Sequence, residues 1–252
     1  MSGDVVTHDL TVRPLVLNDY MTNGFVVKEN DTGALAIVDP GGRADDLVAT
    51  AREWGGDVRA ILVTHLHGDH CAAVAAVAEA FPAADVVGPP GGPFVADRPV
   101  CGGESLEFGA EAILVTATPG HSPESVSFQI CDHVFTGDYL FRHAAGRTDL
   151  SGGSAEDWLR IVCEVFDDMP GATVLWCGHG PPSTVAGELA ATPFWRIARE
   201  GRPEAPVERA RWKGSDVAVL AWADDYDGGR KALLESAGGE LVIVPGSQVE
   251  AG

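Results

Sequence analysis

Basic residues are scarce in this sequence. The 252 residues include 17 Lys and Arg against 37 Asp and Glu, so the formal net charge at pH 7 is −20. Binding to nucleic acid requires clustered basic side chains that neutralise phosphates, and docking on an anionic membrane requires a similar basic surface. We therefore expect neither a nucleic-acid partner nor a membrane partner.

Long apolar runs are also missing. No stretch approaches the roughly 20 apolar residues that a membrane-spanning helix needs. The first residues, Met1-Ser2-Gly3-Asp4, contain no basic segment followed by an apolar one. The sequence thus predicts neither a membrane span nor a signal peptide.

Cysteine is rare and irregularly placed. The five cysteines are Cys71, Cys101, Cys131, Cys163 and Cys177, and no two of them form a CxxC pair. An odd number without paired spacing argues against a disulfide framework. We expect reduced thiols, as is typical of a cytoplasmic protein.

The remaining composition is that of a globular protein. Hydrophobic residues make up 45% and charged residues 21% of the chain, which is long enough to bury a full core. Apolar spacing and turn residues predict an alternating series of strands and helices, with a turn at Asn23-Gly24. The expected elements are a hairpin at 24–38, helices at 43–54, 71–81, 155–168 and 184–200, and strands at 5–17, 58–64, 86–87, 125–130, 133–136 and 173–176. Residues 104–118 are expected to form two strands around Gly109.

The composition changes after residue 200. Glu200 to Pro206 is polar, contains two prolines and is interpreted as a linker. We therefore divide the chain into a catalytic domain at 1–200 and a C-terminal appendage at 201–252. The appendage is predicted to be β-α-β, with strands at 217–222 and 241–244 and a helix at 229–236. It could cap the site, extend a sheet or form a dimer contact in a homo-oligomer, and the sequence leaves these alternatives open.

One short stretch concentrates side chains that bind metals. His65, His67, Asp69 and His70 follow an apolar strand and precede an alanine-rich helix. On an extended segment, residues two apart point to the same side, so His65 and His67 face the same position. Imidazole and carboxylate groups suit Zn, Fe or Mn, with Zn as the first expectation.

Three later strand ends carry further candidate ligands, each next to or near a glycine: His121, Asp138 and His179. A lone histidine in a turn is usually solvated, but the recurrence of the pattern at four strand ends favours a metal site. Seven ligands are too many for one tetrahedral ion, so we expect two divalent ions. The first ion would be held by His65, His67 and His121, and the second by Asp69, His70 and His179. Asp138 would bridge the two ions.

The order of these motifs resembles the metallo-β-lactamase superfamily. The segments are HLHGDH at 65–70, PGHS at 119–122, GD at 137–138 and GHG at 178–180. Segments 135–141, 146–150 and 178–184 further resemble the glyoxalase II-like branch, which contains hydroxyacylglutathione hydrolases. The resemblance covers about residues 20–198. It implies a four-layer αββα sandwich, of the α/β class, with the site at one edge of its two sheets.

The resemblance implies a metal-dependent hydrolase in which a hydroxide held between the metals attacks a thioester or ester. Asp138 would act as the bridging ligand, and Asp69 could accept a proton if the second ion is absent. The branch also includes persulfide dioxygenases with a single non-haem iron, and the segment 146–149 occurs in both groups. A lactonase-type hydrolase is a further alternative. Asp138 argues against true β-lactamases, and the chain after residue 200 lacks the helical region with which glyoxalase II grips glutathione.

Three other residues are candidates for supporting roles. Asp39 ends a strand and is either a carboxylate that orients a histidine ligand or a turn residue before Pro40. Arg147 is a candidate for binding a substrate carboxylate, with an internal salt bridge to Asp149 as the competing expectation. Tyr139 follows Asp138 and is expected either to face the substrate or to pack in the core. We expect Cys71 and Cys177 to be buried packing residues.

Overall fold

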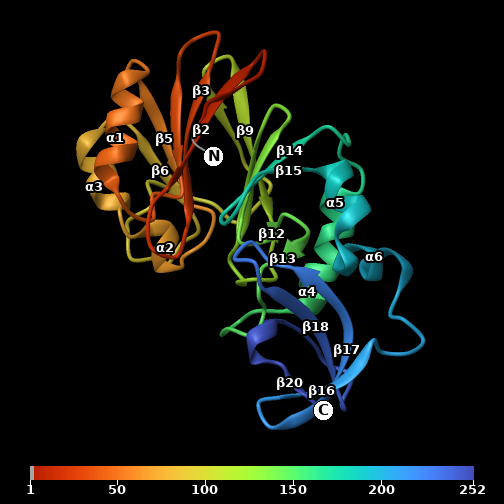
Figure 1. The fold of residues 1–252 in the computed structure, drawn as a ribbon. Coiled ribbons are helices and arrows are strands. Elements are labelled where there is room, and N and C mark those ends of the chain that lie inside the picture. Colours follow the sequence, from red (N-terminus) through yellow and green to blue (C-terminus); the bar gives the residue numbers. More distant parts are fainter. Residues whose placement is uncertain (1–2) are drawn as a thin grey trace. The chain divides into compact units, whose positions relative to one another are not determined.

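The computed structural model describes residues 3–252, which form two compact units (Figure 1). Unit 1 contains the chain up to Ala117, Glu124–Gly137 and Gly178–Gly180, and unit 2 contains Thr118–Pro123, Asp138–Cys177 and Pro181–Gly252. Residues 1 and 2 lie outside the described residues, and they belong to the N-terminal segment for which no signal peptide is predicted. Within residues 3–252, no helix has the length and apolar character needed to cross a membrane.

Unit 1 contains a seven-stranded sheet whose strands follow the order of the sequence. The strands are β1 (Val5–Val6), β2 (Leu10–Val16), β3 (Asn23–Glu29), β4 (Leu35–Val38), β5 (Val58–Leu62), β6 (Asp85–Gly88) and β7 (Arg98–Pro99). Strands β1 to β4 pair antiparallel and β4 to β7 pair parallel. Parallel neighbours need a crossover connection. Helix α1 (Ala44–Glu53) supplies one, and α2 (Gly68–Cys71) with α3 (Val74–Ala80) supplies the next.

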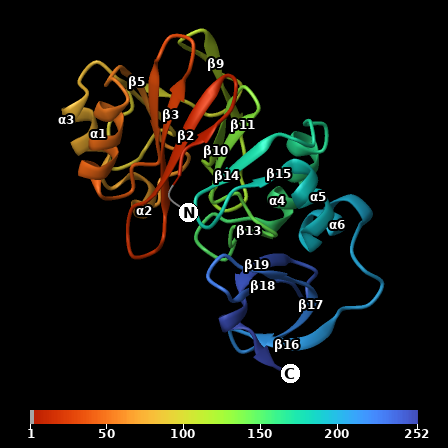
Figure 2. The same cartoon turned by 45° about the horizontal axis from the view of Figure 1, so that its top comes forward.

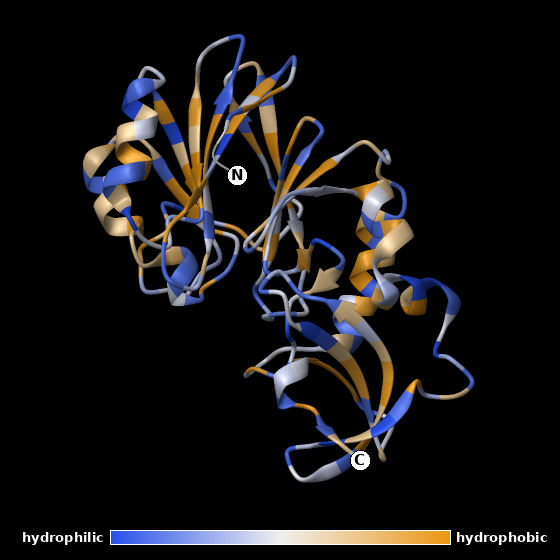
Figure 3. Cartoon of the chain, in the orientation of Figure 1, coloured by the Kyte–Doolittle hydropathy of each residue, from blue (hydrophilic) through white to orange (hydrophobic). Residues whose placement is uncertain are grey.

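Helices α1 and α3 cover this sheet with apolar side chains. Leu47 and Ala51 of α1 and Val77 of α3 are fully buried against Ile37 and Ile61 of the central strands. The hydropathy colouring in Figure 3 shows these apolar strands beside helices that carry polar residues as well. Burying one such aliphatic side chain stabilises the fold by about 1.5–3 kcal/mol. This packing fixes the strand ends from which the site is built.

The second sheet of unit 1 is antiparallel and also follows sequence order (Figure 2). Its strands here are β8 (Ser105–Phe108), β9 (Glu111–Ala117), β10 (Val126–Ile130) and β11 (His133–Gly137). The rings of Phe25 on β3 and Phe135 on β11 lie 5.2 Å apart between centroids, edge to face. The two sheets therefore pack face to face, and unit 1 contains one helical layer and two sheets of the predicted sandwich.

Two predictions in unit 1 are wrong in detail. Asn23 begins β3 instead of a turn, and the turn lies at residues 18–21, where the Asn18 side chain accepts hydrogen bonds from the amides of Tyr20 and Thr22. The helix predicted at 71–81 starts earlier, as α2, and is interrupted before α3. The interruption arises because the Ala73 amide donates to the Pro40 carbonyl, 2.8 Å away, and so leaves the helical ladder.

Unit 2 contains the second group of helices. Its elements before residue 201 are β12 (Leu140–Phe141), β13 (Ala144–Ala145), α4 (Ala155–Ile161), the π-helix η1 (Val162–Phe166), β14 (Val174–Cys177), β15 (Ser183–Thr184), α5 (Val185–Ala191) and α6 (Pro193–Glu200). Ser154 caps α4 by accepting a hydrogen bond from the Asp157 amide, as its position predicts. The helix predicted at 184–200 divides at Pro193, because proline has no N–H to continue the ladder.

The chain after residue 201 forms a five-stranded antiparallel sheet in unit 2. The elements are β16 (Glu208–Trp212), β17 (Ser215–Asp224), β18 (Arg230–Ser236), β19 (Leu241–Pro245), the 3-10 helix η2 (Gly246–Gln248) and β20 (Glu250–Ala251). The strand order is β19-β18-β17-β16-β20. The sheet is joined to the preceding loop because Thr148 and Ile243 exchange two hydrogen bonds of 2.8 Å.

The predicted helix at 229–236 is therefore wrong, and the appendage is not β-α-β. Residues 230–236 favour a helix by composition, but the segment is short and glycines lie on both sides of it. As strand β18 it gains ladder hydrogen bonds from β17 and β19 together. Tertiary pairing thus outweighs local propensity. The domain boundary near residue 200 stays a prediction.

Candidate metal centre

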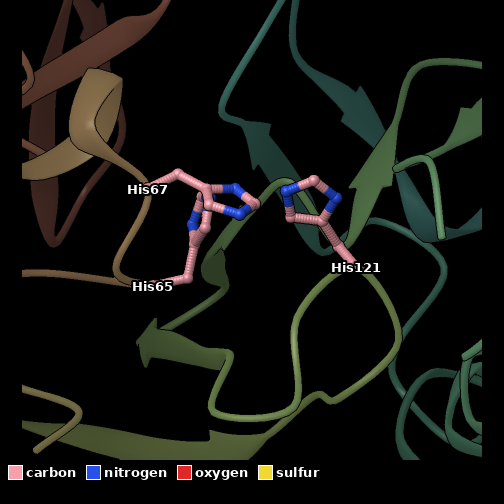
Figure 4. Close-up of side chains that lie close together, drawn as sticks. All are labelled: His65, His67 and His121. Atoms are coloured by element: carbon pink, nitrogen blue, oxygen red, sulfur yellow. The ribbon is translucent and has the colours of Figure 1, made fainter. Parts of the chain in front are cut away.

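The metal-capable stretch, residues 65–70, includes the loop after β5 and the start of α2 in unit 1. Strand β5 is a buried parallel strand, so its carboxyl end delivers the loop to the edge of the sheet, where ligand sites form. Helix α2 begins at Gly68 and places Asp69 and His70 in its first turn. Figure 4 shows the rings of His65 and His67 projecting from the loop that precedes this helix. The loop and the first turn of α2 therefore carry all four side chains within six residues.

Asp69, His70 and His179 form a compact group in unit 1. Their ligand atoms lie within 4.8 Å of one another. The Asp69 Oδ2 atom lies 3.6 Å from His70 Nε2 and 3.5 Å from His179 Nε2. The ligand atoms of a tetrahedral zinc with bonds of about 2.0–2.2 Å lie roughly 3.3–3.6 Å apart. The two measured separations fit a common ion better than they fit direct hydrogen bonds.

The other ring nitrogen of each histidine has a hydrogen-bond partner. His179 Nδ1 lies 3.1 Å from the Tyr20 carbonyl oxygen, and His70 Nδ1 lies 2.9 Å from Asp39 Oδ2. A carbonyl oxygen only accepts, so the Nδ1 atom of His179 is the donor. In the neutral ring this leaves the Nε2 lone pair for a ligand bond. Both rings are thus held in the tautomer and the orientation that a metal requires.

Asp39 is the side chain that organises this group. Its carboxylate is buried and accepts hydrogen bonds of 2.8 Å from the Thr64 amide and from the Thr64 hydroxyl. Hydrogen bonds to charged groups contribute about 1.5–3 kcal/mol each. With its contact to His70, the carboxylate ties the end of β4 to both ends of the ligand loop. The structure thus contains the predicted contact to a histidine, and its role toward a metal stays a proposal.

The GHG segment is attached to the start of β3. The Asn23 amide donates to the Gly178 carbonyl, and the Asn23 side chain donates to the Gly180 carbonyl, both at 2.7 Å. A nearby contact joins Thr22 Oγ1 to Asp69 Oδ2 at 2.8 Å. No pattern in the sequence marked Thr22 or Asn23 as a supporting residue. An Asn-Gly pair is a strong turn signal, so the sequence predicts a turn here and not a contact between the Asn23 side chain and the GHG segment.

Asp138 and His121 lie close together in unit 2. His121 Nε2 is 3.6 Å from Asp138 Oδ2, and His121 Nδ1 is 2.8 Å from the Arg147 carbonyl oxygen. His121, which Figure 4 also labels, lies in the loop after β9. A Cβ atom at Gly146 would lie 1.8 Å from the Asp138 carbonyl oxygen. Only glycine permits this close approach, so the glycine that begins segment 146–149 has a structural role.

The two candidate substrate-binding residues differ in position. The Arg147 guanidinium donates two hydrogen bonds to the Asp149 carboxylate, at 2.7 and 2.8 Å. The salt bridge that was the competing expectation is therefore present. Its action as a substrate ligand stays a prediction. Tyr139 is fully buried, stacks on Trp158 and donates its hydroxyl to the Trp158 carbonyl at 2.7 Å. Burial holds the pKa of the Tyr139 phenol well above its usual value. The substrate-binding prediction for Tyr139 is therefore wrong.

The cysteines beside the ligands are packing residues, as expected. Cys71 and Cys177 are buried, and all five cysteines are free thiols. Burial raises the pKa of both thiols. A neutral, buried thiol is a poor nucleophile and a poor metal ligand.

The sequence matches the model of a known protein family over most of its length. The family model described as the metallo-beta-lactamase superfamily matches residues 17–187. The chain belongs to the metallo-β-lactamase superfamily. The resemblance inferred from the HLHGDH, PGHS, GD and GHG segments is thereby confirmed, and the chain is a member of a superfamily of metal-dependent hydrolases.

Two curated relatives of this superfamily member match most of their own length. The probable metallo-hydrolase YqgX of Bacillus subtilis is 31% identical over 212 residues, covering 73% of this chain and 95% of the relative. A hydroxyacylglutathione hydrolase of Xanthomonas euvesicatoria is 33% identical over 236 residues, covering 77% of this chain and 91% of the relative. The predicted likeness to the glyoxalase II-like branch is confirmed.

Solved structures confirm the predicted metallo-β-lactamase sandwich. The BLEG-1 B3 metallo-beta-lactamase superposes with a TM-score of 0.67 and 31% identity, covering 73% of this chain and 99% of that one. ETHE1 from Myxococcus xanthus superposes with a TM-score of 0.67 and 27% identity, covering 77% of this chain and 92% of that one. TTHA1623 in a di-iron-bound form superposes with a TM-score of 0.63 and 30% identity, covering 72% of this chain and 98% of that one.

Proposed function

We propose that this protein is a metal-dependent hydrolase that cleaves a thioester or ester at a centre of two divalent ions. The observation that carries the proposal is the Asp69, His70 and His179 group, whose ligand atoms lie within 4.8 Å of one another. The outer nitrogens of both imidazoles are already bonded, to Asp39 and to the Tyr20 carbonyl. A hydrogen-bonded outer nitrogen is typical of metal-binding histidines. Zn is the first expectation, with Fe or Mn as alternatives.

The proposed centre would be held by seven side chains: His65, His67, Asp69, His70, His121, Asp138 and His179. The first ion would be held by His65, His67 and His121, and the second by Asp69, His70 and His179. Asp138 would bridge the ions. The di-iron form named for TTHA1623 supports a centre with two metals in this fold.

The chemistry needs little from the protein beyond positioning. Bound divalent ions would lower the pKa of water toward neutrality and polarise the substrate carbonyl. Asp39 and the Tyr20 carbonyl hold the histidine rings, and Thr22 donates to Asp69, which limits rotation of that carboxylate. Asp69 could accept a proton if its own ion is absent. A thiolate is a good leaving group, so no protein acid has to protonate it.

The substrate class follows from the relatives and from the C-terminal sheet. The hydroxyacylglutathione hydrolase of Xanthomonas supports a small acyl thioester as substrate. The part of the chain after residue 201 is an antiparallel sheet and lacks the helical region expected to grip glutathione. The proposed substrates are therefore glutathione thioesters, other acyl thioesters and esters. Five free thiols support a reducing, cytoplasmic location.

The test combines metal analysis with a substrate panel. Protein purified without added metal is analysed for Zn, Fe and Mn, and then assayed on an acyl glutathione, a second acyl thioester, a lactone and a β-lactam. We expect about two metal ions per chain and the fastest turnover on a thioester. One Fe per chain, with thiol-dependent oxygen uptake and no hydrolysis, would overturn the proposal in favour of a persulfide dioxygenase.

A further inference from the structure

A lysine in the C-terminal sheet is buried almost completely. Lys231 lies on β18 and is 3% exposed. Lysine is rarely buried unless it is paired, because removing an ammonium group from water is costly. The residue lies outside the family match at 17–187, and the proposed reaction does not use it. Its burial therefore calls for a specific explanation.

The surroundings of Lys231 form a compact group in unit 2. The Lys231 ammonium donates to Asp225 Oδ1 at 3.1 Å. The same nitrogen lies 4.3 Å from the centroid of the Phe141 ring and 5.4 Å from that of Tyr226. The two rings meet edge to face, with centroids 5.4 Å apart. The ammonium is thus enclosed by one carboxylate and two aromatic rings, the arrangement of a cation–π site.

This group is connected to the candidate bridging ligand through the backbone. Phe141 lies on the short strand β12, and Tyr139 just before it is fixed by its stacking on Trp158. The segment 138–141 is therefore held by Trp158 at Tyr139 and by Lys231 at Phe141. Burial lowers the pKa of Lys231, while the charge of Asp225 and the weaker one of Asp138 oppose that shift.

We infer that Lys231 is a positioning residue that fixes the segment carrying Asp138, so that the C-terminal sheet supports the metal centre without supplying a ligand. The inference rests on the proposed function, which makes Asp138 a metal ligand. Lys231 would act through its contact with the Phe141 ring, and it is not one of the proposed ligands. Outer partners of metal ligands typically affect metal affinity or activity by about 10–100-fold. A lysine from a sheet with no ligand of its own would thus influence the centre.

The variant Lys231→Met tests this inference, because methionine keeps much of the length and removes the charge. Metal-free protein is titrated with cobalt(II), which reports affinity and, through its visible absorption, the coordination geometry. We expect a loss of cobalt affinity of about tenfold or more, with a changed absorption band. Lys231→Arg, which keeps the charge over Phe141, should lie closer to wild type in both readouts.

Lys213 provides the matched control. It lies in the turn that joins β16 to β17 of the same sheet, with its ammonium 4.2 Å from the centroid of the Trp212 ring, and its side chain is exposed. Lys213→Met removes the same charge and a similar cation–π contact at a distance from Asp138. We expect wild-type cobalt affinity and an unchanged absorption band for this variant.

The outcomes separate three accounts. If Lys231→Met lowers only the melting temperature and keeps the cobalt affinity and spectrum, Lys231 is merely structural and the inference fails. If the wild-type protein binds no cobalt, the proposed function itself fails. If Lys231→Met does not fold, Phe141→Leu tests the same contact and keeps the pair of Lys231 with Asp225. A wild-type cobalt spectrum and affinity in Phe141→Leu would also overturn the inference.

Discussion

Two buried carboxylates, one in each unit, hold a nitrogen-bearing side chain in different ways. Asp39 in unit 1 contacts the Thr64 amide, the Thr64 hydroxyl and the imidazole of His70, all within 2.9 Å. Asp225 in unit 2 accepts from the Lys231 ammonium at 3.1 Å and from the Tyr226 amide at 2.9 Å. Asp39 therefore contacts one candidate ligand directly, whereas Asp225 contacts the ammonium of Lys231, for which a positioning role is proposed.

The difference predicts where the loss of each carboxylate will be measured. Asp39 contacts the Nδ1 atom of His70, and the Nε2 atom of the same ring is the proposed metal ligand. Removal of the Asp39 carboxylate should therefore lower metal affinity. Asp225 neutralises a buried ammonium, and removing one partner of a buried ion pair leaves an uncompensated charge. Its loss should appear first in the stability of the metal-free protein.

The largest effect is expected from the candidate ligands themselves. His67→Ala or Asp138→Ala should remove metal and activity together, because each deletes a proposed ligand from a different unit. The loss should exceed the roughly 10–100-fold that is typical of outer partners. Metal content after dialysis and thioester hydrolysis measure it. His8→Ala, which removes an exposed histidine, serves as the control. Full activity in either ligand variant would contradict the assignment.

The next effect is expected from Asp225→Asn in the metal-free protein. Breaking a buried ion pair typically costs about 3–5 kcal/mol, and we expect a loss of unfolding free energy near the lower end because asparagine still accepts a hydrogen bond. Urea denaturation measures it. Asp216→Asn changes an acid of the same sheet that is 96% exposed, and it should shift the free energy by less than about 0.5 kcal/mol. Equal small shifts in both variants would remove the distinction between the two carboxylates.

The smallest effect in free energy is expected from Asp39→Asn. The His70 ring would lose its carboxylate partner, and metal affinity should fall by about 10–100-fold. Competition with a chelator of known affinity measures the change. Asp57→Asn, at an exposed carboxylate paired with Arg59, is the matched control in unit 1. Unchanged affinity in Asp39→Asn would show that Asp39 serves only the turn before Pro40.

The ligand loop was predictable because its signal is local. His65, His67, Asp69 and His70 follow a buried strand and enter a helix, and strand and helix periodicity fix where such side chains project. The group of Asp69, His70 and His179 needs one contact distant in the sequence, which the recurrence of histidine and glycine at strand ends indicated. The Ser154 cap was predictable for the same local reason.

The supporting contacts were not predictable because they depend on pairing across the chain. Asn23 holds residues 178–180 from the start of β3, and no local pattern distinguishes that use from a turn. Strand β18 has the composition of a helix and becomes a strand only because β17 and β19 lie beside it. Once that segment is assigned to a helix, the burial of Lys231 against Phe141 cannot be inferred.

The most direct test of the account is the stoichiometry of zinc binding. Metal-free protein is titrated with Zn²⁺ by calorimetry, and hydrolysis of a thioester is followed as each equivalent is added. Two equivalents per chain are predicted, with activity rising until the second is bound. Asp69→Ala should bind no more than one with high affinity. A wild-type protein that is saturated, and fully active, with a single zinc would contradict a centre of two ions.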